Sequence, residues 1–360
     1  MGGRPVDPRA ELLRDLTEAP GASGFEDSVR QIARAACAPL GEVSRDGLGS
    51  LLITAPGSGS ASAPRVLLGA HMDEVGFLIT RVTPEGFLRF QTLGGWWEQV
   101  MLAQRVHVIS RRGPVLGIVG SKPPHVLPAE ARKKVVEKAE MFIDIGAGSA
   151  ADVEAMGVRP GDFAVPVCPF AELGQLYAGK AFDDRAGCAL VIEAMRAARG
   201  SHPNTLIGAL TVQEETGLRG AQTSVTAARP DVAISLDVGI AGDTPGMKPE
   251  EAQARLGGGP VALLYDGSLI PNPRLRDLVA DTAAQAGIPF QYDLIPGGGN
   301  DGGRFQQFGQ GVPTICLGIP ARYIHSATSV ISRSDFDHAV DLLAALVRRL
   351  DQAAIRGLTP

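Results

Sequence analysis

The sequence is short of the residues from which several kinds of structure are built. Its 360 residues include four cysteines, Cys37, Cys168, Cys188 and Cys316, which stand far apart and form no CxxC pair. This spacing excludes a disulfide framework and a metal site made of cysteines, and it suits a reducing compartment. We therefore expect free thiols, most of them in the core.

Long runs of one kind of residue are also missing. The longest apolar runs, VALLY, VLLGA and LLAALV, fall far short of the roughly 20 residues that span a bilayer, and the opening MGGRPVDPRAELL has no apolar signal segment. The longest basic run is Arg132-Lys133-Lys134 in a chain of net charge −5, so nothing attracts it to a phosphate backbone. We expect a cytoplasmic protein with neither nucleic acid nor a membrane as a partner.

Most of the chain shows the pattern of an α/β protein. Hydrophobic residues make up 44% of it, enough to fill a large core. Apolar residues recur at helical spacing in 8–19 and in 25–40, the latter after a possible Ser23 cap, and RVLLGAH is typical of a buried strand. From Gly179 onward predicted strands and helices alternate, ending in a long helix over 335–355. This alternation predicts an α/β sandwich around a largely parallel or mixed sheet.

A segment with a different sequence pattern interrupts the α/β alternation. Between 75 and 162 the chain consists of short β-rich pieces broken by glycine, such as VGFLITRV and VLGIVGS. We therefore predict a small β-rich domain, residues 75–162, inserted into a catalytic domain made of residues 1–74 and 163–360. Within the insert, the charged segment AEARKKVVEKAE is predicted to be a loop, with a helix as the alternative.

Acidic and histidine residues follow several of the apolar runs. They come from five segments of the chain: His71 and Asp73, Asp183, Glu214 and Glu215, Asp237, and His325. In open α/β sheets, ligands bind at the carboxyl ends of the strands. Any one of these residues alone is better explained as a cap or a solvated corner, but their joint placement predicts a metal site.

Charge arithmetic favours two metal ions over one. Two divalent ions carry four positive charges. Asp183, Glu215 and Asp237 supply three negative charges and a bridging hydroxide the fourth, which leaves His71 and His325 as neutral ligands. Imidazole and carboxylate ligands without thiolate favour Zn²⁺, with Co²⁺ or Mn²⁺ as alternatives.

Two further carboxylates have expected roles beside the metals. Asp73 lies two residues after His71, on the same side of a strand, so its carboxylate can reach the second imidazole nitrogen and fix the tautomer. If the strand LIGALTVQ ends at Gln213, Glu215 can bind a metal while Glu214 faces the shared water and accepts its proton.

Other polar residues lack this placement. We predict structural roles for His107, His125 and His202. For Asp301, in the glycine-rich GGGNDGGRF, we favour a cap for the following helix over a place in the site. Arg322 beside His325 would either favour acidic substrates or pair with a carboxylate such as Asp237.

The chain resembles the TET-type metallo-aminopeptidases, a family of glutamyl and deblocking aminopeptidases in which some members are labelled endoglucanase or cellulase. The matching segments run in order over nearly the whole chain: SGFEDSVR, AHMDEVGF, SKPPH, FIDIGAGS, GVRPGD, GKAFDDRAGC, VQEETGLRGA, SLDVG and RYIHS. The resemblance implies a metal-dependent enzyme that hydrolyses N-terminal residues from peptides.

The resemblance also implies roles for individual residues and an assembly. Asp183 would bridge two metals, with His71 and Asp237 on one metal and Glu215 and His325 on the other, while Glu214 would be the general base. The wider group implies a cis bond between Asp183 and Asp184. The inserted domain would mediate dimerisation, and dimers would form a hollow dodecamer. The family's GTDA segment reads GGNDGG here, with Asn300 and Gly302 at the changed positions.

Other function classes fit the sequence less well. A glycoside hydrolase needs two carboxyl groups across a sugar and usually aromatic platforms, whereas aromatic residues make up 5% of this chain and Trp96-Trp97 falls in the insert, where an interface role is expected. An amidohydrolase or deacylase acting on small N-acyl substrates would use the same metal chemistry, so the sequence separates it poorly. A binding protein without activity has no need of the complete ligand set.

Overall fold

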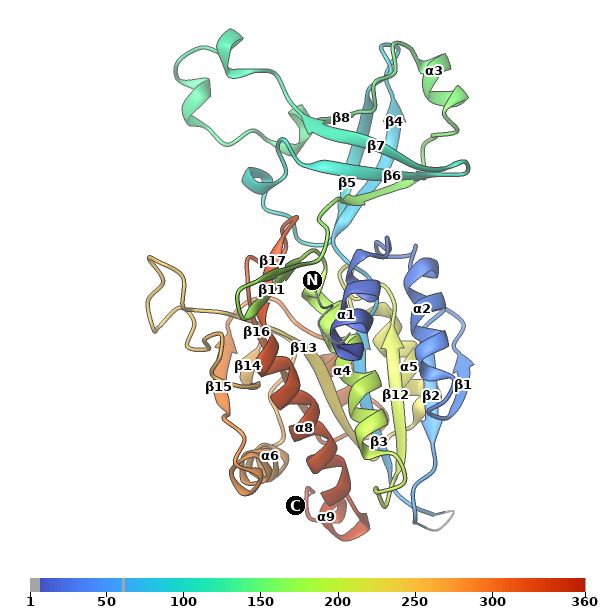
Figure 1. Cartoon of the computed structure of the whole chain (residues 1–360), viewed down its shortest axis with the longest axis vertical. Coiled ribbons are helices and arrows are strands. Elements are labelled where there is room, and N and C mark those ends of the chain that lie inside the picture. The colour runs from blue at the N-terminus through green and yellow to red at the C-terminus, as the bar shows by residue number, and fades with distance from the viewer. Residues whose placement is uncertain (1–6, 60–61, 360) are drawn as a thin grey trace, which may run out of the picture.

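A large mixed sheet runs through the main body of the protein. The computed structural model describes residues 7–59 and 62–359; the first six residues of the opening segment lie outside this part. Figure 1 shows the main body with a small β barrel above it. Within the described residues the sheet has eleven strands: β1 (Glu42–Arg45), β2 (Leu51–Ala55), β3 (Arg65–His71), β10 (Ala171–Leu173), β11 (Leu176–Gly179), β12 (Thr205–Thr211), β13 (Val232–Ile240), β14 (Val261–Asp266), β15 (Gln291–Ile295), β16 (Thr314–Arg322) and β17 (Ser329–Ser332).

Parallel strands form the centre of this sheet. The order is β1-β2-β12-β3-β13-β16-β17-β11-β10, with β14 joining β16 and β15, and β12, β3, β13 and β16 run parallel to one another. Strand β3 is buried on both faces because Val66 and Leu68 pack into one hydrophobic cluster and Leu67 into another. A strand covered on both sides reads as a continuous apolar run, which is why RVLLGAH is so apolar.

Helices cover both faces. The described helices are α1 (Pro8–Glu18), α2 (Asp27–Cys37), α3 (Ala150–Ala155), α4 (Phe182–Ala198), α5 (Arg219–Ala228), α6 (Pro273–Ala286), α7 (Gly302–Gln306), α8 (Arg333–Arg349) and α9 (Gln352–Arg356). The first cluster contains residues of α1, α2, α4, α6 and α8, and the second contains residues of α5 and α7. Helix α7 packs closely against β3, because a Cβ added to Gly69 of β3 would lie 2.5 Å from the ring of Phe305 of α7. The predicted α/β sandwich is confirmed.

The segment after β3 forms a closed barrel. Its strands are β4 (Gly76–Val82), β5 (Leu88–Leu93), β6 (Arg105–Ser110), β7 (Gly113–Gly120), β8 (Phe142–Asp144) and β9 (Phe163–Pro166), in the order β4-β5-β8-β7-β6-β9. The barrel has its own apolar cluster, which includes Phe77, Leu88 and Val106. Strand β9 lies beyond residue 162, so the barrel extends past the predicted edge of the insert. The division of the chain into two domains stays a prediction.

The charged segment of the insert has little regular structure. Short 3-10 turns occur at η1 (Glu98–Val100), η2 (Pro124–Val126), η3 (Ala131–Lys133) and η4 (Lys138–Glu140). The last two fall within AEARKKVVEKAE, which otherwise forms the predicted loop. No helix in the described part of the chain is both long enough and apolar enough to cross a membrane.

Two predicted helix boundaries were wrong. The helix predicted over 335–355 is two helices, because α8 ends at Arg349 and the side chain of Asp351 caps α9. Helix α2 begins at Asp27, and Ser23 does not cap it. The hydroxyl of Ser23 donates instead to the carboxylate of Asp73, 2.5 Å away. A nearby buried carboxylate therefore takes the hydroxyl that the sequence pattern assigned to a helix.

Candidate metal centre and active site

The carboxyl ends of the central strands bring the candidate residues to one edge of the sheet. His71 ends β3 and lies opposite Thr211, the last residue of β12. Strand β13, which carries Asp237, flanks β3 on the other side, and His325 follows the end of β16. The arrangement is the one expected for ligand sites in parallel sheets.

Asp183 lies between two histidines. Its Oδ1 is 3.3 Å from Nε2 of His71, and its Oδ2 is 3.3 Å from Nε2 of His325. Two groups of side chains suited to metal binding share this aspartate: His71, Asp183 and Asp237, and Asp183, Glu215 and His325, each with its ligand atoms within 4.8 Å of one another. One carboxylate thus offers an oxygen to each of two neighbouring sites. The peptide bond between Asp183 and Asp184 is cis.

The strand breaks just before the two adjacent glutamates. Strand β12 ends at Thr211, and Gln213 has a φ of +56°, a left-handed conformation uncommon for a residue with a side chain. The alternation of a strand therefore no longer applies to Glu214 and Glu215. Oε2 of Glu214 is 3.7 Å from Nε2 of His71, and Oε2 of Glu215 is 3.7 Å from Nε2 of His325.

Asp73 holds this break in place. Its carboxylate accepts hydrogen bonds from the backbone N–H groups of Glu214, at 3.0 Å, and Glu215, at 3.1 Å. Its Oδ1 lies 3.5 Å from Nδ1 of His71, within the predicted reach, and the same nitrogen is 3.0 Å from the backbone carbonyl of Asp73. The main chain is thus the nearer partner of the imidazole, and the carboxylate holds the turn that carries the glutamates.

Two residues that the sequence reasoning missed support His71. Oδ2 of the buried Asp184 accepts from the backbone N–H of His71 at 3.1 Å, and the thiol of Cys188 donates to the His71 carbonyl at 3.0 Å. The two adjacent aspartates of the motif GKAFDDRAGC could have drawn attention to Asp184. Its partner, His71, lies more than a hundred residues away in the chain, so spacing alone could not identify the contact.

Burial and crowding control the ionisation of the carboxylates. Burial, the largest cause, raises the pKa of Glu214 and of Asp237 well above the ordinary range, and repulsion from neighbouring carboxylates adds to it. Burial and then the charge of Asp183 raise the pKa of Glu215 to about 8. Protein groups alone therefore do not balance the negative charge at this edge.

The histidines respond in the opposite sense. Burial alone would lower the pKa of His325, but the contact with Asp183 raises it to about 10. The pKa of His71 is raised well above its ordinary range against the same effect of burial, chiefly by Glu214 and then Asp183. Each imidazole thus attracts a proton where a metal ion would supply the positive charge.

The donor set fits metal ions. It combines imidazole nitrogens with carboxylate oxygens, which are ligands of Zn²⁺, Co²⁺ and Mn²⁺. Among the described residues, the buried Oε1 of Glu215 has no hydrogen-bond partner, although a buried carboxylate oxygen normally has one. A cation at this position would satisfy it.

Asp301 is buried beside the site and does not cap α7. The helix receives no side-chain bond from Asp301, and Asn300 instead accepts from the Gly302 N–H at 2.8 Å. Oδ2 of Asp301 accepts the hydroxyl of Thr211, and its buried Oδ1 has no partner among the described groups. The predicted cap was wrong because the neighbouring asparagine takes that role.

The candidate site opens into a cleft of about 640 Å³. All five predicted metal ligands and Glu214 line it, and so does Gly95 from the loop after β5. That loop lies close: a Cβ on Gly94 would be 2.7 Å from Oε2 of Glu215, and one on Gly95 would be 3.0 Å from Nδ1 of His325. The barrel segment therefore supplies part of the wall of the site.

The remaining polar predictions lie outside this cleft. His107, His125 and His202 are not among its described lining residues. Arg322 pairs with Asp243 through two contacts of 2.7 Å, so the partner suggested from the sequence, Asp237, was wrong. In the barrel, Trp96 stacks on Phe77 while Trp97 is exposed.

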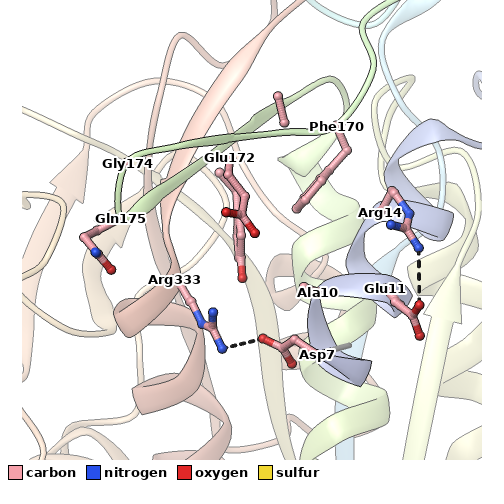
Figure 2. A pocket seen from close by; sticks show the side chains of 11 residues that line it. Asp7, Ala10, Glu11, Arg14, Phe170, Glu172, Gly174, Gln175 and Arg333 are labelled. Carbon is pink, nitrogen blue, oxygen red and sulfur yellow. Dashed lines mark ion pairs between the residues drawn. The ribbon is translucent and has the colours of Figure 1, made fainter. Parts of the chain in front are cut away.

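A second cleft, of about 690 Å³, lies between α1, the β10–β11 hairpin and the start of α8. Figure 2 shows Asp7 facing Arg333, and Glu11 facing Arg14. Its described lining contains no histidine or cysteine. Its charges are paired, and neither of the described groups of side chains suited to metal binding lies in it, so it is a weaker candidate than the first cleft.

Comparison with known proteins gives the family. A model described as M42 glutamyl aminopeptidase matches residues 49–342. The crystal structure of a TET aminopeptidase from the marine sediment archaeon Thaumarchaeota archaeon SCGC AB-539-E09 is 46% identical, with a TM-score of 0.95 over 98% of this chain and 99% of that one. The glutamyl aminopeptidase of Lactococcus lactis is 34% identical over 95% of this chain and 96% of its own length.

The names of two further relatives mention a different specificity and an assembly. The lysyl aminopeptidase of Pyrococcus furiosus is 33% identical over 94% of this chain and 97% of its own length. The Pyrococcus horikoshii TET1 peptidase, described as able to assemble into a tetrahedron or a large octahedral shell, is 33% identical with a TM-score of 0.85, over 95% of this chain and 100% of that one. The family model and these relatives each match most of the chain. The chain therefore belongs to the M42 glutamyl aminopeptidase family and is an aminopeptidase.

Proposed function

We propose that the chain removes N-terminal residues from peptides with two divalent metal ions. His71, Asp183 and Asp237 would hold one ion, and Asp183, Glu215 and His325 the other. The observation that carries the proposal is the position of Asp183, whose two oxygens each face a different imidazole at 3.3 Å. The donor atoms favour Zn²⁺, with Co²⁺ and Mn²⁺ as alternatives.

When bound, the ions would act as Lewis acids that polarise the scissile carbonyl and lower the pKa of the attacking water. Glu214 is the general base: its carboxylate accepts the proton from the water and then passes it to the leaving amine. Asp73 fixes the backbone of Glu214 throughout.

We further propose a cytoplasmic homo-oligomer, with dimers built through an inserted domain of residues 75–162 and assembled into a dodecamer. The tetrahedron or large octahedral shell described for the Pyrococcus horikoshii relative supports a large homo-oligomer. The barrel segment also exposes apolar side chains, with Trp97 58%, Leu116 53% and Ile118 49% exposed, as expected of an interaction surface. Size-exclusion chromatography with light scattering should give twelve times the mass of one chain, and Leu116→Glu with Ile118→Glu should reduce it.

The test of the reaction is hydrolysis of aminoacyl-p-nitroanilides before and after chelation. Activity should vanish with the chelator and return with Zn²⁺, Co²⁺ or Mn²⁺. Glu214→Gln should lower kcat by about 10²- to 10⁴-fold without changing metal content measured by mass spectrometry. Glu85→Gln, at an exposed position in the barrel, is the matched control.

Parallel assays separate the related chemistries. N-acyl amides test for a deacylase, and a glucan tests for a glycoside hydrolase. Chelator-resistant turnover, or a metal-loaded protein that cleaves only N-acyl amides or glucan, would overturn the proposal.

A further inference from the structure

The lining of the active-site cleft contains apolar side chains that the proposed mechanism does not use. Beyond the proposed metal ligands and Glu214, its described lining includes six larger apolar side chains: Leu218, Val238, Ile240, Leu263, Ile295 and Ile324. Two of these residues, Leu263 and Ile295, pack in the same cluster, and we call them the apolar wall. We propose that this wall receives the N-terminal side chain of the substrate and selects uncharged, apolar residues of the size of leucine or methionine. The inference rests on the proposed aminopeptidase mechanism and adds its specificity.

An acidic side chain would find no cation there. Among the described residues that line the cleft there is no lysine or arginine. Arg322, which lies close to His325 in the sequence, donates through Nε and Nη2 to the two carboxylate oxygens of Asp243. A glutamyl side chain would therefore lose its hydration without gaining an ion pair, which is costly in an apolar environment.

A basic side chain would find no free carboxylate. Apart from the proposed metal ligands and Glu214, Asp266 is the acid in the described lining, and it is buried. Its Oδ1 accepts from the Ser268 backbone N–H at 2.6 Å, the Ser268 hydroxyl at 2.8 Å and the Leu269 N–H at 2.9 Å, while its Oδ2 accepts from the Asn300 amide. Both oxygens of Asp266 are thus already occupied by groups of the protein.

The apolar wall offers the compensating gain. Leu263 is 5% exposed and packs in a cluster with Leu269 and Ile295. An apolar side chain buried against these residues leaves water and contacts carbon, whereas alanine fills less of the space. Loss of a methylene-sized contact in such a pocket changes kcat/KM by about 10- to 200-fold.

The first experiment compares kcat/KM of the metal-loaded protein for the p-nitroanilides of leucine, methionine, alanine, glutamate and lysine. Leucine or methionine should exceed glutamate and lysine by at least about tenfold. Preference for glutamate or lysine would overturn the specificity and leave the proposed function intact. Failure to cleave any of the panel would overturn both, so the two failures are distinguishable.

The second experiment places a charge in the wall. Ile295→Lys should raise the ratio of kcat/KM for glutamate over leucine by about tenfold or more, and Ile295→Glu should do the same for lysine over leucine. Leu294→Lys is the matched control, because this side chain is the next on β15, is exposed and is absent from the described lining. Folding of each variant is checked by its unfolding temperature. Ratios that stay unchanged in both Ile295 variants, or that shift equally in the Leu294 variant, would contradict the assignment.

Discussion

Single hydrogen bonds decide where the two glutamates point. A left-handed residue, Gln213, turns the chain out of β12, and the Asp73 carboxylate then holds the next two backbone N–H groups. Left-handed conformations also occur at Ala181, two residues before Asp183, and at His325 itself. Unfavourable backbone conformations of this kind persist where the surrounding structure enforces them, and they cluster at functional sites.

Replacement of Asp73 by asparagine should disturb both glutamates. The amide group places a donor where the carboxylate accepted from Ser23, Glu214 and Glu215, so one of these contacts becomes repulsive. We expect Asp73→Asn to lower metal affinity and kcat by about 10- to 100-fold each. Metal titration followed by steady-state kinetics measures the two effects.

Ser23→Ala provides the control for this change. It removes a hydroxyl donor to Asp73 and leaves both backbone contacts in place, so its losses should be much smaller. Equal losses in the two variants would show that the backbone contacts of Asp73 do not position the glutamates.

The candidate site was predictable to the extent that it depends on strand ends. Parallel neighbours bring their carboxyl ends together, so His71 and Asp237 could be placed at one edge from the apolar runs before them. The contacts of Asp184 and Ser23 could not be predicted, because each reaches a group far away in the chain. Asp301 was misassigned because cap propensity does not reveal which of two neighbouring polar residues turns toward the helix.

Among the secondary-structure elements, α1 and α4 are joined through a buried charge cluster. Arg185 of α4 is fully buried and donates to the carbonyls of Leu16 and Ala19 at the end of α1, which have no partner within the helix. Glu74, just after β3, contacts Nζ of Lys180 at 2.6 Å and Arg185 at 3.4 Å. One carboxylate thus compensates two buried cations.

Removal of that carboxylate should destabilise the fold. Glu74→Gln leaves Lys180 and Arg185 buried without a negative partner, and loss of one member of a buried pair costs about 3–5 kcal/mol. Urea unfolding of the metal-free protein should show this loss. Glu85→Gln, an exposed change of the same kind, should leave the midpoint of unfolding close to that of the parent. A similar midpoint for both variants would contradict the role of Glu74.

Most elements were visible in the sequence because their apolar periodicity matches the layer they occupy. The alternating order after Gly179 predicted the sandwich, and the glycine-broken segment predicted the β-rich insert. The sequence did not reveal the closure of the insert into a barrel, since closure depends on pairing between β4 and β9, which lie far apart in the chain. It also did not reveal the buried Arg185, because arginine is rarely buried without a partner.

At the scale of the whole molecule, the charge of the site links stability to pH. Without metal, the pKa of Glu215 is raised to about 8 and that of His325 to about 10. Between its ordinary value and the raised one, each group binds more protons in the folded state than in the unfolded state, so the free energy of unfolding falls as the pH rises. The pH range of this effect starts near pH 4.5 for Glu215 and near pH 6.5 for His325. The two ranges overlap from pH 6.5 to about 8.

Chelator-treated protein should therefore lose thermal stability as the pH rises from 6.5 to 8. Metal-loaded protein should lose less, because metal ions replace the protons on these groups and stabilise the folded state by mass action. Differential scanning calorimetry at several pH values measures both slopes. Glu215→Gln removes one titrating group and should flatten the slope of the metal-free form. Parallel slopes with and without metal would argue against this explanation.

The glycines at 94 and 95 connect the barrel to the chemistry. Their backbone lies so close to Glu215 and His325 that added Cβ atoms would meet those side chains at 2.7 and 3.0 Å. The barrel segment therefore forms part of the cleft at the edge of the main sheet. A truncated protein with a short linker in place of residues 75–162 would keep every proposed ligand and Glu214, but it would lack this wall of the cleft. The evolutionary exchange of one barrel for another would have to preserve that loop.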